Sequence, residues 1–192
     1  MILASASPRR KAILESLGIR FEVVFPEVDE VLFETDAART VTENSLRKGE
    51  WCRKRNPQRH IIAADTALEF RGRCITKPSS LRNASEILRT LSGRAHSVLT
   101  GVYFSVPGRG VDVKVTVSSV TFNSLDDSLI RRYLSLVNPL DKAGAYDINQ
   151  HGDLIIRSVS GSRTNVMGLP VETVTEWITT IDSDRVVPMS AS

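Results

Sequence analysis

Two arginines stand at the start of a predicted helix near the N-terminus, in the run Ala4-Ser5-Ala6-Ser7-Pro8-Arg9-Arg10. The Ser7-Pro8 pair is typical of a helix start, because serine caps free N–H groups and proline fits the first turn. Those N–H groups and the helix dipole attract anions, and guanidinium groups match phosphate oxygens. Two cations here cost roughly 0.3 to 1 kcal/mol each, which a bound polyphosphate would offset. The alternative is an ordinary helix start with both arginines facing water. The side chains of the expected phosphate site are Ser5, Ser7, Arg9 and Arg10.

Asp65 and Thr66 follow the apolar run Ile61-Ile62-Ala63-Ala64, which we interpret as a central strand that stops at the carboxylate. Ligands of α/β proteins collect at the carboxyl ends of such strands. A carboxylate there can hold a divalent metal ion or accept a proton from water, and the residue types leave both roles open. The alternative is an aspartate that caps the following turn.

Lys48, within a predicted helix, and Lys77, in a predicted loop, are two further cations. Each alone is more often a surface lysine. Together with Arg9, Arg10 and Asp65 they describe a cationic pocket that contains a carboxylate, the arrangement that phosphate chemistry uses.

Other titratable residues give weaker signals. The loop pair Asp29 and Glu30 is a possible second acidic element, with a solvated pair as the alternative. The histidines and cysteines lack the spacing of a zinc site. Neither a Walker loop nor a Gly-x-Gly-x-x-Gly motif occurs, which argues against a kinase or a dinucleotide-binding protein. The residues without metal-site spacing are His60, His96, His151, Cys52 and Cys74.

Composition narrows the class of protein. The 192 residues contain 25 Lys and Arg against 22 Asp and Glu, a formal charge of +3, which is too small a surplus to predict nucleic acid as a partner. The run Arg53-Lys54-Arg55 is more typical of a solvated helix face. No apolar run approaches the roughly 18 to 20 residues of a membrane span, and no signal sequence is evident. Two cysteines cannot form a disulfide scaffold, so we expect a cytoplasmic protein.

Short apolar strands alternate with amphipathic segments, which is typical of an α/β fold. We predict strands at 2–4, 21–25, 60–65, 95–106, 111–122 and 154–156. We predict helices at 8–17, 37–55, 81–91, 125–137 and 170–181. The long hairpin of 95–106 and 111–122 favours a mixed sheet over a parallel one. No repeat or linker divides the chain, so we expect one domain over 1–182 and a tail over 183–192.

Several blocks of sequence resemble the Maf family of nucleoside triphosphate pyrophosphatases in order and spacing, from about residue 2 to residue 172. Each block alone is weakly specific, and their shared register carries the resemblance. The blocks are Leu3-Ala4-Ser5-Ala6-Ser7-Pro8-Arg9-Arg10, Ala64-Asp65-Thr66, Lys77-Pro78, His96 with Thr100-Gly101-Val102, Asp141-Lys142-Ala143-Gly144-Ala145-Tyr146 and Asn165-Val166-Met167-Gly168-Leu169-Pro170.

The resemblance implies an elongated mixed α/β sheet flanked by helices, of the inosine-triphosphate-pyrophosphatase type, with two lobes around a cleft. It implies cleavage of a nucleoside triphosphate between the α- and β-phosphates, giving a monophosphate and pyrophosphate, with Mg²⁺ or Mn²⁺ as cofactor. A homodimer is also implied. The chain is similar in particular to the subfamily that acts on dTTP and UTP, in which two arginines follow the serine-proline pair and the acid motif reads Asp-Thr.

Residue roles follow from the same match. Asp65 corresponds to the family's proton acceptor, and Arg10 and Thr66 fall on positions linked to substrate preference. The phosphate-facing positions are Arg9, Lys48 and Lys77. The metal ion would be held by Asp65 with Glu30, and because Asp65 cannot easily be both a tight ligand and an efficient base, its role stays open.

One position departs from the subfamily pattern and concerns recognition of the nucleotide base. Three residues after Tyr146 the subfamily usually places glutamine, whereas this chain has Asn149, followed by Gln150. Asparagine keeps the amide with a shorter reach. Either Asn149 still contacts the base, Gln150 replaces it, or the preference is broader.

Two other functions compete with this reading. A nucleotide- or nucleic-acid-binding regulator of cell division or septum formation, without turnover, is compatible with the basic balance. A phosphatase that acts on other phosphate esters is the second, and it would release orthophosphate first.

Overall fold

A seven-stranded mixed sheet forms the centre of the protein, with the strands in the order β2-β1-β3-β5-β6-β7 and β4 beside β3. The computed structural model describes residues 1–185 and the side chains of residues 1–180. The strands are β1 (Ile2–Ala4), β2 (Glu22–Val24), β3 (Ile61–Phe70), β4 (Arg73–Ile75), β5 (Ala95–Val106), β6 (Gly110–Phe122) and β7 (Ile156–Ser160). The helices are α1 (Pro8–Ser16), α2 (Ala37–Arg55), α3 (Leu81–Leu91), α4 (Asp127–Leu136), α5 (Gly152–Ile155), α6 (Arg163–Val166) and α7 (Val171–Arg185), with a 3-10 turn η1 (Ala143–Ala145).

The pairing of β3 leaves a gap on one of its sides. Antiparallel β5 accompanies β3 from Ile61 to Glu69. On the opposite side, parallel β1 covers Ile61–Ala63 and antiparallel β4 covers Leu68–Phe70. Residues 64–67 therefore lie between two short neighbours, facing the point where β1 ends and the chain turns into α1.

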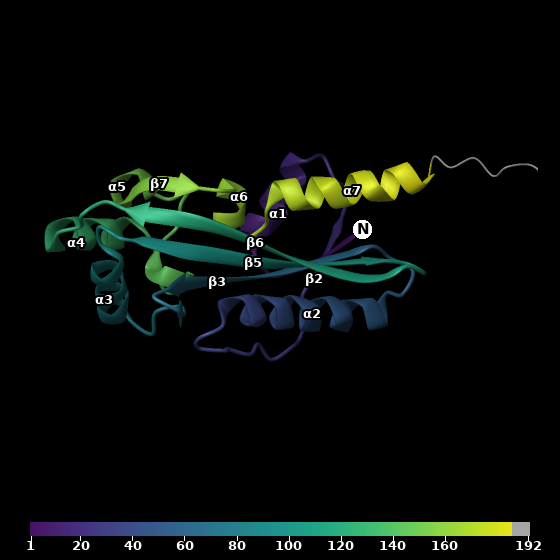
Figure 1. The fold of residues 1–192 in the computed structure, drawn as a ribbon, viewed down its shortest axis with the longest axis horizontal. Helices are drawn as coiled ribbons and strands as arrows, with labels where there is room; N and C mark the ends of the chain where they lie inside the picture. The colour runs from purple at the N-terminus through teal and green to yellow at the C-terminus, as the bar shows by residue number, and fades with distance from the viewer. Residues whose placement is uncertain (186–192) are drawn as a thin grey trace, which may run out of the picture.

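The helices gather in two groups along the sheet (Figure 1). At one end α2 covers one face, and α1 and α7 lie across the other. Successive side chains of β3 point to opposite faces of the sheet, which fits this arrangement. Ile62 packs in one cluster with Leu14 of α1 and Trp177 of α7. Its neighbour Ile61 packs in another cluster with Cys52 of α2.

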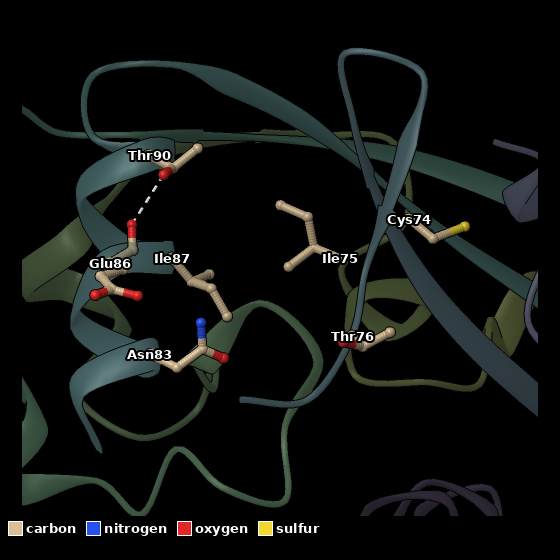
Figure 2. Close-up of a pocket in the computed structure, with 7 residues that line it drawn as sticks. All are labelled: Cys74, Ile75, Thr76, Asn83, Glu86, Ile87 and Thr90. Atoms are coloured by element: carbon tan, nitrogen blue, oxygen red, sulfur yellow. Dashed lines mark hydrogen bonds between the residues drawn. The ribbon is translucent and has the colours of Figure 1, made fainter. Parts of the chain in front are cut away.

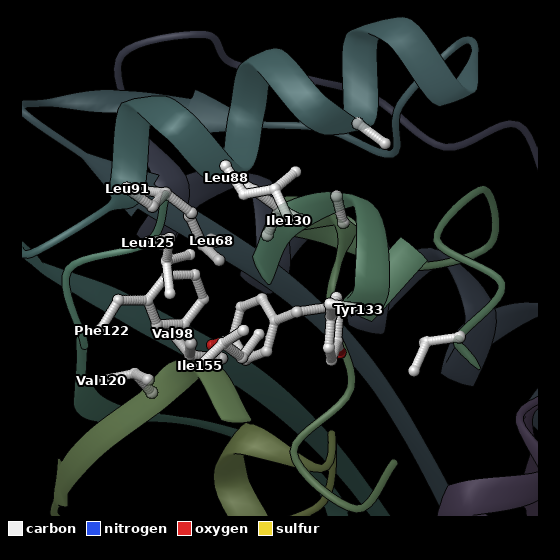
Figure 3. Close-up of a cluster of buried hydrophobic side chains, with 14 residues drawn as sticks. Leu68, Leu88, Leu91, Val98, Val120, Phe122, Leu125, Ile130, Tyr133 and Ile155 are labelled. Atoms are coloured by element: carbon white, nitrogen blue, oxygen red, sulfur yellow. The ribbon is translucent and has the colours of Figure 1, made fainter. Parts of the chain in front are cut away.

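The other end of the sheet has a core of its own, between the strands and helices α3 and α4 (Figure 3). Leu88 and Leu91 of α3, Ile130 and Tyr133 of α4, and Phe122 of β6 are buried there. The mixed sheet flanked by helices confirms the predicted fold class.

α2 approaches the sheet closely because glycines lie at the contact, one in the sheet and one in the helix. A Cβ on Gly101 of β5 would come within 2.5 Å of the Val41 carbonyl oxygen of α2. A Cβ on Gly49 of α2 would overlap the ring of Tyr103. Since Gly101 pairs with Asp65, this close approach of the helix backbone to the sheet lies beside the candidate catalytic carboxylate.

Several predicted elements differ from the structure. β3 runs on to Phe70, so the prediction that the strand stops at Asp65 is wrong: the β5 pairing continues past it. Segment 154–156 was predicted as a strand, but its first two residues end α5 and only Ile156 opens β7. α4 is capped by Asp126 and begins at Asp127, later than predicted.

The C-terminal boundary is tested in part. α7 extends to Arg185, beyond the predicted end at 181, and residues 186–192 of the expected tail lie outside the described part of the chain. Among residues 1–185 no helix combines the length and apolar character of a membrane span.

Candidate active site

Asp65 lies in the interior of β3 with two hydrogen-bond donors from α2. Lys48 Nζ is 2.7 Å from Asp65 Oδ1, and Asn44 Nδ2 donates to Asp65 Oδ2 at 3.1 Å. Asn44 and Lys48 are four residues apart on one face of α2, so a single helix face supplies both donors. All three residues are buried. The sequence analysis missed Asn44, although its spacing from Lys48 was a readable signal.

Lys48 bridges two carboxylates. Its Nζ lies 2.6 Å from Glu30 Oε1 as well as 2.7 Å from Asp65 Oδ1. Burial raises the pKa of Glu30, but Lys48, Lys77 and Arg10 together outweigh it and hold that pKa below its ordinary value. The structure thus places Glu30, expected as a second acidic element, beside Asp65, with the charges of Lys77 and Arg10 acting on it.

The Arg10 side chain is held by three protein acceptors. Nε donates to the Gly168 carbonyl at 2.8 Å, Nη1 to Ser5 Oγ at 3.2 Å and Nη2 to Thr66 Oγ1 at 3.0 Å. Burial lowers the pKa of the guanidinium, while Asp65 acts in the opposite direction. These protein acceptors therefore offset part of the cost of placing this cation at a helix N-terminus. A bound polyphosphate is not needed to offset all of it.

Thr66 belongs to a chain of hydrogen bonds with a defined direction. Thr100 Oγ1 donates to the Asn165 carbonyl at 3.1 Å, so in its 3.0 Å contact with Thr66 it accepts. Thr66 in turn accepts from Arg10. The Asn165 amide is fully buried and donates to Val98 O and Ser118 Oγ, both at 3.0 Å. This chain ties β3 and β5 to α6, a connection that sequence patterns did not predict.

Ser7 caps α1 as predicted. Its Oγ accepts from the Arg10 backbone N–H at 3.5 Å, and the Ser7 N–H donates to Ser5 Oγ at 3.2 Å. Pro8 occupies the first position of the helix. The first turn of α1 lies next to the gap in β3, because its Arg10 side chain reaches Thr66 there.

Arg9 makes an ion pair with a residue far along the chain. Its Nη1 lies 2.9 Å from Oδ2 of Asp147, which follows the 3-10 turn. Asn149 and Gln150, the two candidates for a contact with the base, are exposed residues two and three positions further on. Sequence analysis did not single out Asp147.

His96 is a structural residue of the second core. Its Nε2 lies 2.9 Å from the Tyr146 hydroxyl, and its ring packs edge-on against Phe122 and Tyr146. Burial lowers the pKa of His96 to about 4. It connects β5 to the segment that carries Asp147 and Asn149.

A cavity of about 300 Å³ lies apart from this site, between β4 and α3 (Figure 2). Figure 2 shows Ile75 and Ile87 facing each other across it. The cavity does not include Asp65 or its partners. Its lining residues are Cys74, Ile75, Thr76, Asn83, Glu86, Ile87 and Thr90.

Comparison with known proteins places the chain in a family. Residues 1–181 match the family model described as Maf-like protein. The dTTP/UTP pyrophosphatase of Thermotoga maritima is 41% identical over 93% of this chain and 87% of that protein. Proteins of the same name from Latilactobacillus sakei and Fusobacterium nucleatum are 41% and 34% identical, over 92% of this chain each and 98% and 92% of their own lengths.

The solved structure of the Staphylococcus aureus Ham1 protein has a TM-score of 0.53 and 17% identity, over 94% of this chain and 98% of that one. This likeness shows the fold alone. With a family model matched over residues 1–181 and relatives that are 34% to 41% identical over most of their length, the chain belongs to the Maf family.

Proposed function

We propose that this protein hydrolyses dTTP, UTP or related nucleotides to the monophosphate and pyrophosphate. The observation that carries the proposal is a cluster of opposite charges from separate segments, in which Lys48 contacts both Asp65 and Glu30. Burial lowers the pKa of Arg10, and the negative charge of Asp65 acts to raise it. Lys77 acts on neighbouring Glu30. The names of the Maf relatives support the same reaction and substrate class.

In this proposal water attacks the α-phosphorus, the bond from that phosphorus to the bridging oxygen breaks, and pyrophosphate leaves. Asp65 orients the water and accepts its proton. Each oxygen of Asp65 receives one hydrogen bond, from Lys48 or Asn44, and keeps a second lone pair for the water. Arg9, Lys48 and Lys77 neutralise the phosphates, and Ser5, Ser7 and the α1 N-terminus complete the phosphate site. Positioning and charge neutralisation supply most of the rate.

A divalent cation, Mg²⁺ or Mn²⁺, belongs to the proposal. By donor type the carboxylates of Asp65 and Glu30 fit such an ion, which typically takes one or two carboxylates plus substrate phosphates. Lys48 contacts one oxygen of each carboxylate and Asn44 contacts the other oxygen of Asp65, so Glu30 would be the main ligand of the ion and Asp65 a weak one that remains available as the base. When bound, it would neutralise charge on the leaving phosphates. Among the described residues no group of three or more His, Cys, Asp and Glu side chains forms a metal site, so substrate oxygens would have to complete the coordination.

The test is a panel of dTTP, UTP, CTP, their methylated relatives and the purine triphosphates, with and without Mn²⁺. We expect pyrophosphate from the pyrimidine nucleotides. Orthophosphate as the first product would identify a general phosphatase instead, and tight binding without any product would identify a regulator.

The basic residues that motivated the regulatory alternative are largely engaged within the protein. Arg53 pairs with Glu50, Arg59 with Glu22, and Arg55 stacks on the Trp51 ring. These contacts favour a solvated helix face over a nucleic-acid surface.

A homodimer and a cytoplasmic location complete the proposal. Both rest on the sequence analysis. Light scattering of the purified protein would measure the mass of the assembly directly.

A further inference from the structure

Asp147 is a buried carboxylate at the meeting point of two parts of the proposed site. Its side chain is 3% exposed, and its Oδ2 lies 2.9 Å from Nη1 of Arg9, whose side chain is 37% exposed. The two residues are 138 positions apart, so the pair joins the start of α1 to the segment after η1. A buried carboxylate is strongly unfavourable without a partner, and Arg9 supplies that partner.

The same carboxylate holds its own loop. Its Oδ1 accepts the backbone N–H of Asn149 at 2.9 Å, and its Oδ2 lies 3.5 Å from Gln150 Nε2. The backbone of Asp147 is fixed by the fully buried Tyr133, whose hydroxyl accepts from the Asp147 N–H at 2.9 Å and donates to the Asp147 carbonyl at 3.4 Å. Asp147 cannot shift without disturbing both the loop and Arg9.

Arg9 uses only one of its nitrogens in this contact. The pair occupies Nη1 and leaves Nε and Nη2 for a phosphate group. Asp147 thus holds the guanidinium from its buried side while the exposed side faces solvent. In this geometry Asp147 supports Arg9 as an anion-binding side chain and does not compete with the anion for it.

We propose that Asp147 is a positioning residue that couples phosphate binding at Arg9 to base recognition by the loop of Asn149 and Gln150. The inference rests on the proposed function. In the wild-type protein one carboxylate fixes both the arginine and the loop, so the two ends of the nucleotide are bound by parts that move together.

The first test is Asp147→Asn, which keeps the side-chain shape and removes the charge. We expect KM for dTTP and UTP to rise about tenfold, the equivalent of one charge-assisted hydrogen bond, with little change in kcat. The ratio of kcat/KM for UTP over CTP should fall in the same variant. A matched control is Asp127→Asn, which removes a surface carboxylate paired with Arg89 at 2.7 Å and should change neither quantity. An unchanged KM, or a lower KM as competition for Arg9 would give, overturns the proposal.

The second test is Arg9→Gln, alone and combined with Asp147→Asn. If Asp147 acts through Arg9, the double variant has the KM of Arg9→Gln alone. Arg9→Gln alone should also lower the UTP to CTP ratio of kcat/KM, although it leaves Asp147 and the loop residues in place. This measurement does not require Asp147→Asn to fold. The coupling is contradicted if the two substitutions have additive effects on KM. It is also contradicted if Arg9→Gln leaves the UTP to CTP ratio of kcat/KM unchanged. Wild-type protein that releases no pyrophosphate would defeat the proposed function itself, whereas an active wild type with unaffected variants defeats only the inference.

Discussion

Lys48 is the side chain on which the arrangement at Asp65 depends. Its ammonium contacts both Asp65 and Glu30 and is itself buried. Two carboxylates this close repel each other unless a cation lies between them. Lys48 therefore allows the two acids to share one site, as the proposed reaction requires.

Asp65→Asn tests the proposed base. The amide keeps the size of the side chain but cannot accept the water proton, so we expect turnover to fall by about 10² to 10⁴-fold. Pyrophosphate release at saturating nucleotide and metal measures it, and circular dichroism checks the fold. Near-normal hydrolysis would exclude Asp65 as the base.

Glu30→Gln separates metal binding from proton transfer. If Glu30 helps to hold the ion, this variant should need several-fold more Mn²⁺ for half-maximal activity and recover most of its turnover at high metal concentration. Titration of activity with Mn²⁺ measures the change. Glu27→Gln, an exposed acid in the same loop, is the control, and identical metal curves for the two variants would contradict the role of Glu30.

Asn149→Ala and Gln150→Ala decide which amide contacts the base. Gln150 Nε2 lies within 3.5 Å of Asp147, whereas Asn149 is held through its backbone N–H, which leaves its side-chain amide for a ligand. We expect the UTP to CTP ratio of kcat/KM to change several-fold in Asn149→Ala and little in Gln150→Ala. The reverse result would assign the role to Gln150.

The position of α2 relative to the sheet decides which side chains reach Asp65. Asn44 and Lys48 contact the carboxylate only because the helix backbone lies against Gly101, the residue paired with Asp65. A longer helix-to-sheet distance would leave the same residues in the sequence without the same contacts. Close packing of α2 is thus a requirement of the site as well as of the core.

Gly101→Ala tests this requirement. The added methyl group would meet the Val41 carbonyl at 2.5 Å, so the helix must move away. We expect a loss of about 1 to 3 kcal/mol in the free energy of unfolding, as for other overpacked sites, together with a lower kcat. Urea unfolding and pyrophosphate release measure the two effects.

Gly152→Ala is the control, because its new Cβ would meet the end of the Ile156 side chain at 3.3 Å, which can shift, and the Asp147 carbonyl oxygen at 3.5 Å, an ordinary contact distance. Wild-type stability and kcat in Gly101→Ala would show that the close approach is unnecessary.

His96 connects the core between the sheet and helices α3 and α4 to the segment of Asp147 and Asn149. Its pKa in the folded state is about 4, against about 6.5 in an unfolded chain. Because protonation favours the unfolded chain, the neutral ring contributes its full stability above pH 6.5. This contribution is lost as the pH falls from 6.5 towards 4.

His96→Gln removes the titration and keeps a side-chain amide for the Tyr146 hydroxyl. Between pH 7.5 and 4.5 the wild type should lose roughly 2 to 3 kcal/mol more free energy of unfolding than the variant. Urea unfolding of both proteins at the two pH values measures the difference. Equal losses would mean that His96 is not held neutral in the folded protein.

Local signals predicted most of the elements. The Ser7-Pro8 pair predicted the start of α1, and apolar periodicity predicted α2, α3 and β5 with the bounds that the structure has. It predicted the end of β3 wrongly, because the hydropathy of a strand changes at Asp65 while its hydrogen bonding to β5 continues. The short β4 and the divided segment 152–160 gave too little periodicity to be identified.

The sequence by itself determined the types of residue that the chemistry needs and the order in which they occur. Only the tertiary structure decided which of them touch: Lys48 on two carboxylates, Arg10 on Thr66, and Arg9 on Asp147 across 138 positions. The physical reason is that burial patterns depend on a residue and its near neighbours, whereas contacts between distant polar groups depend on strand register and on how closely helices approach the sheet. Those distances are set by packing of the entire chain, as at Gly101 opposite Asp65, where a Cβ would come within 2.5 Å of the α2 backbone.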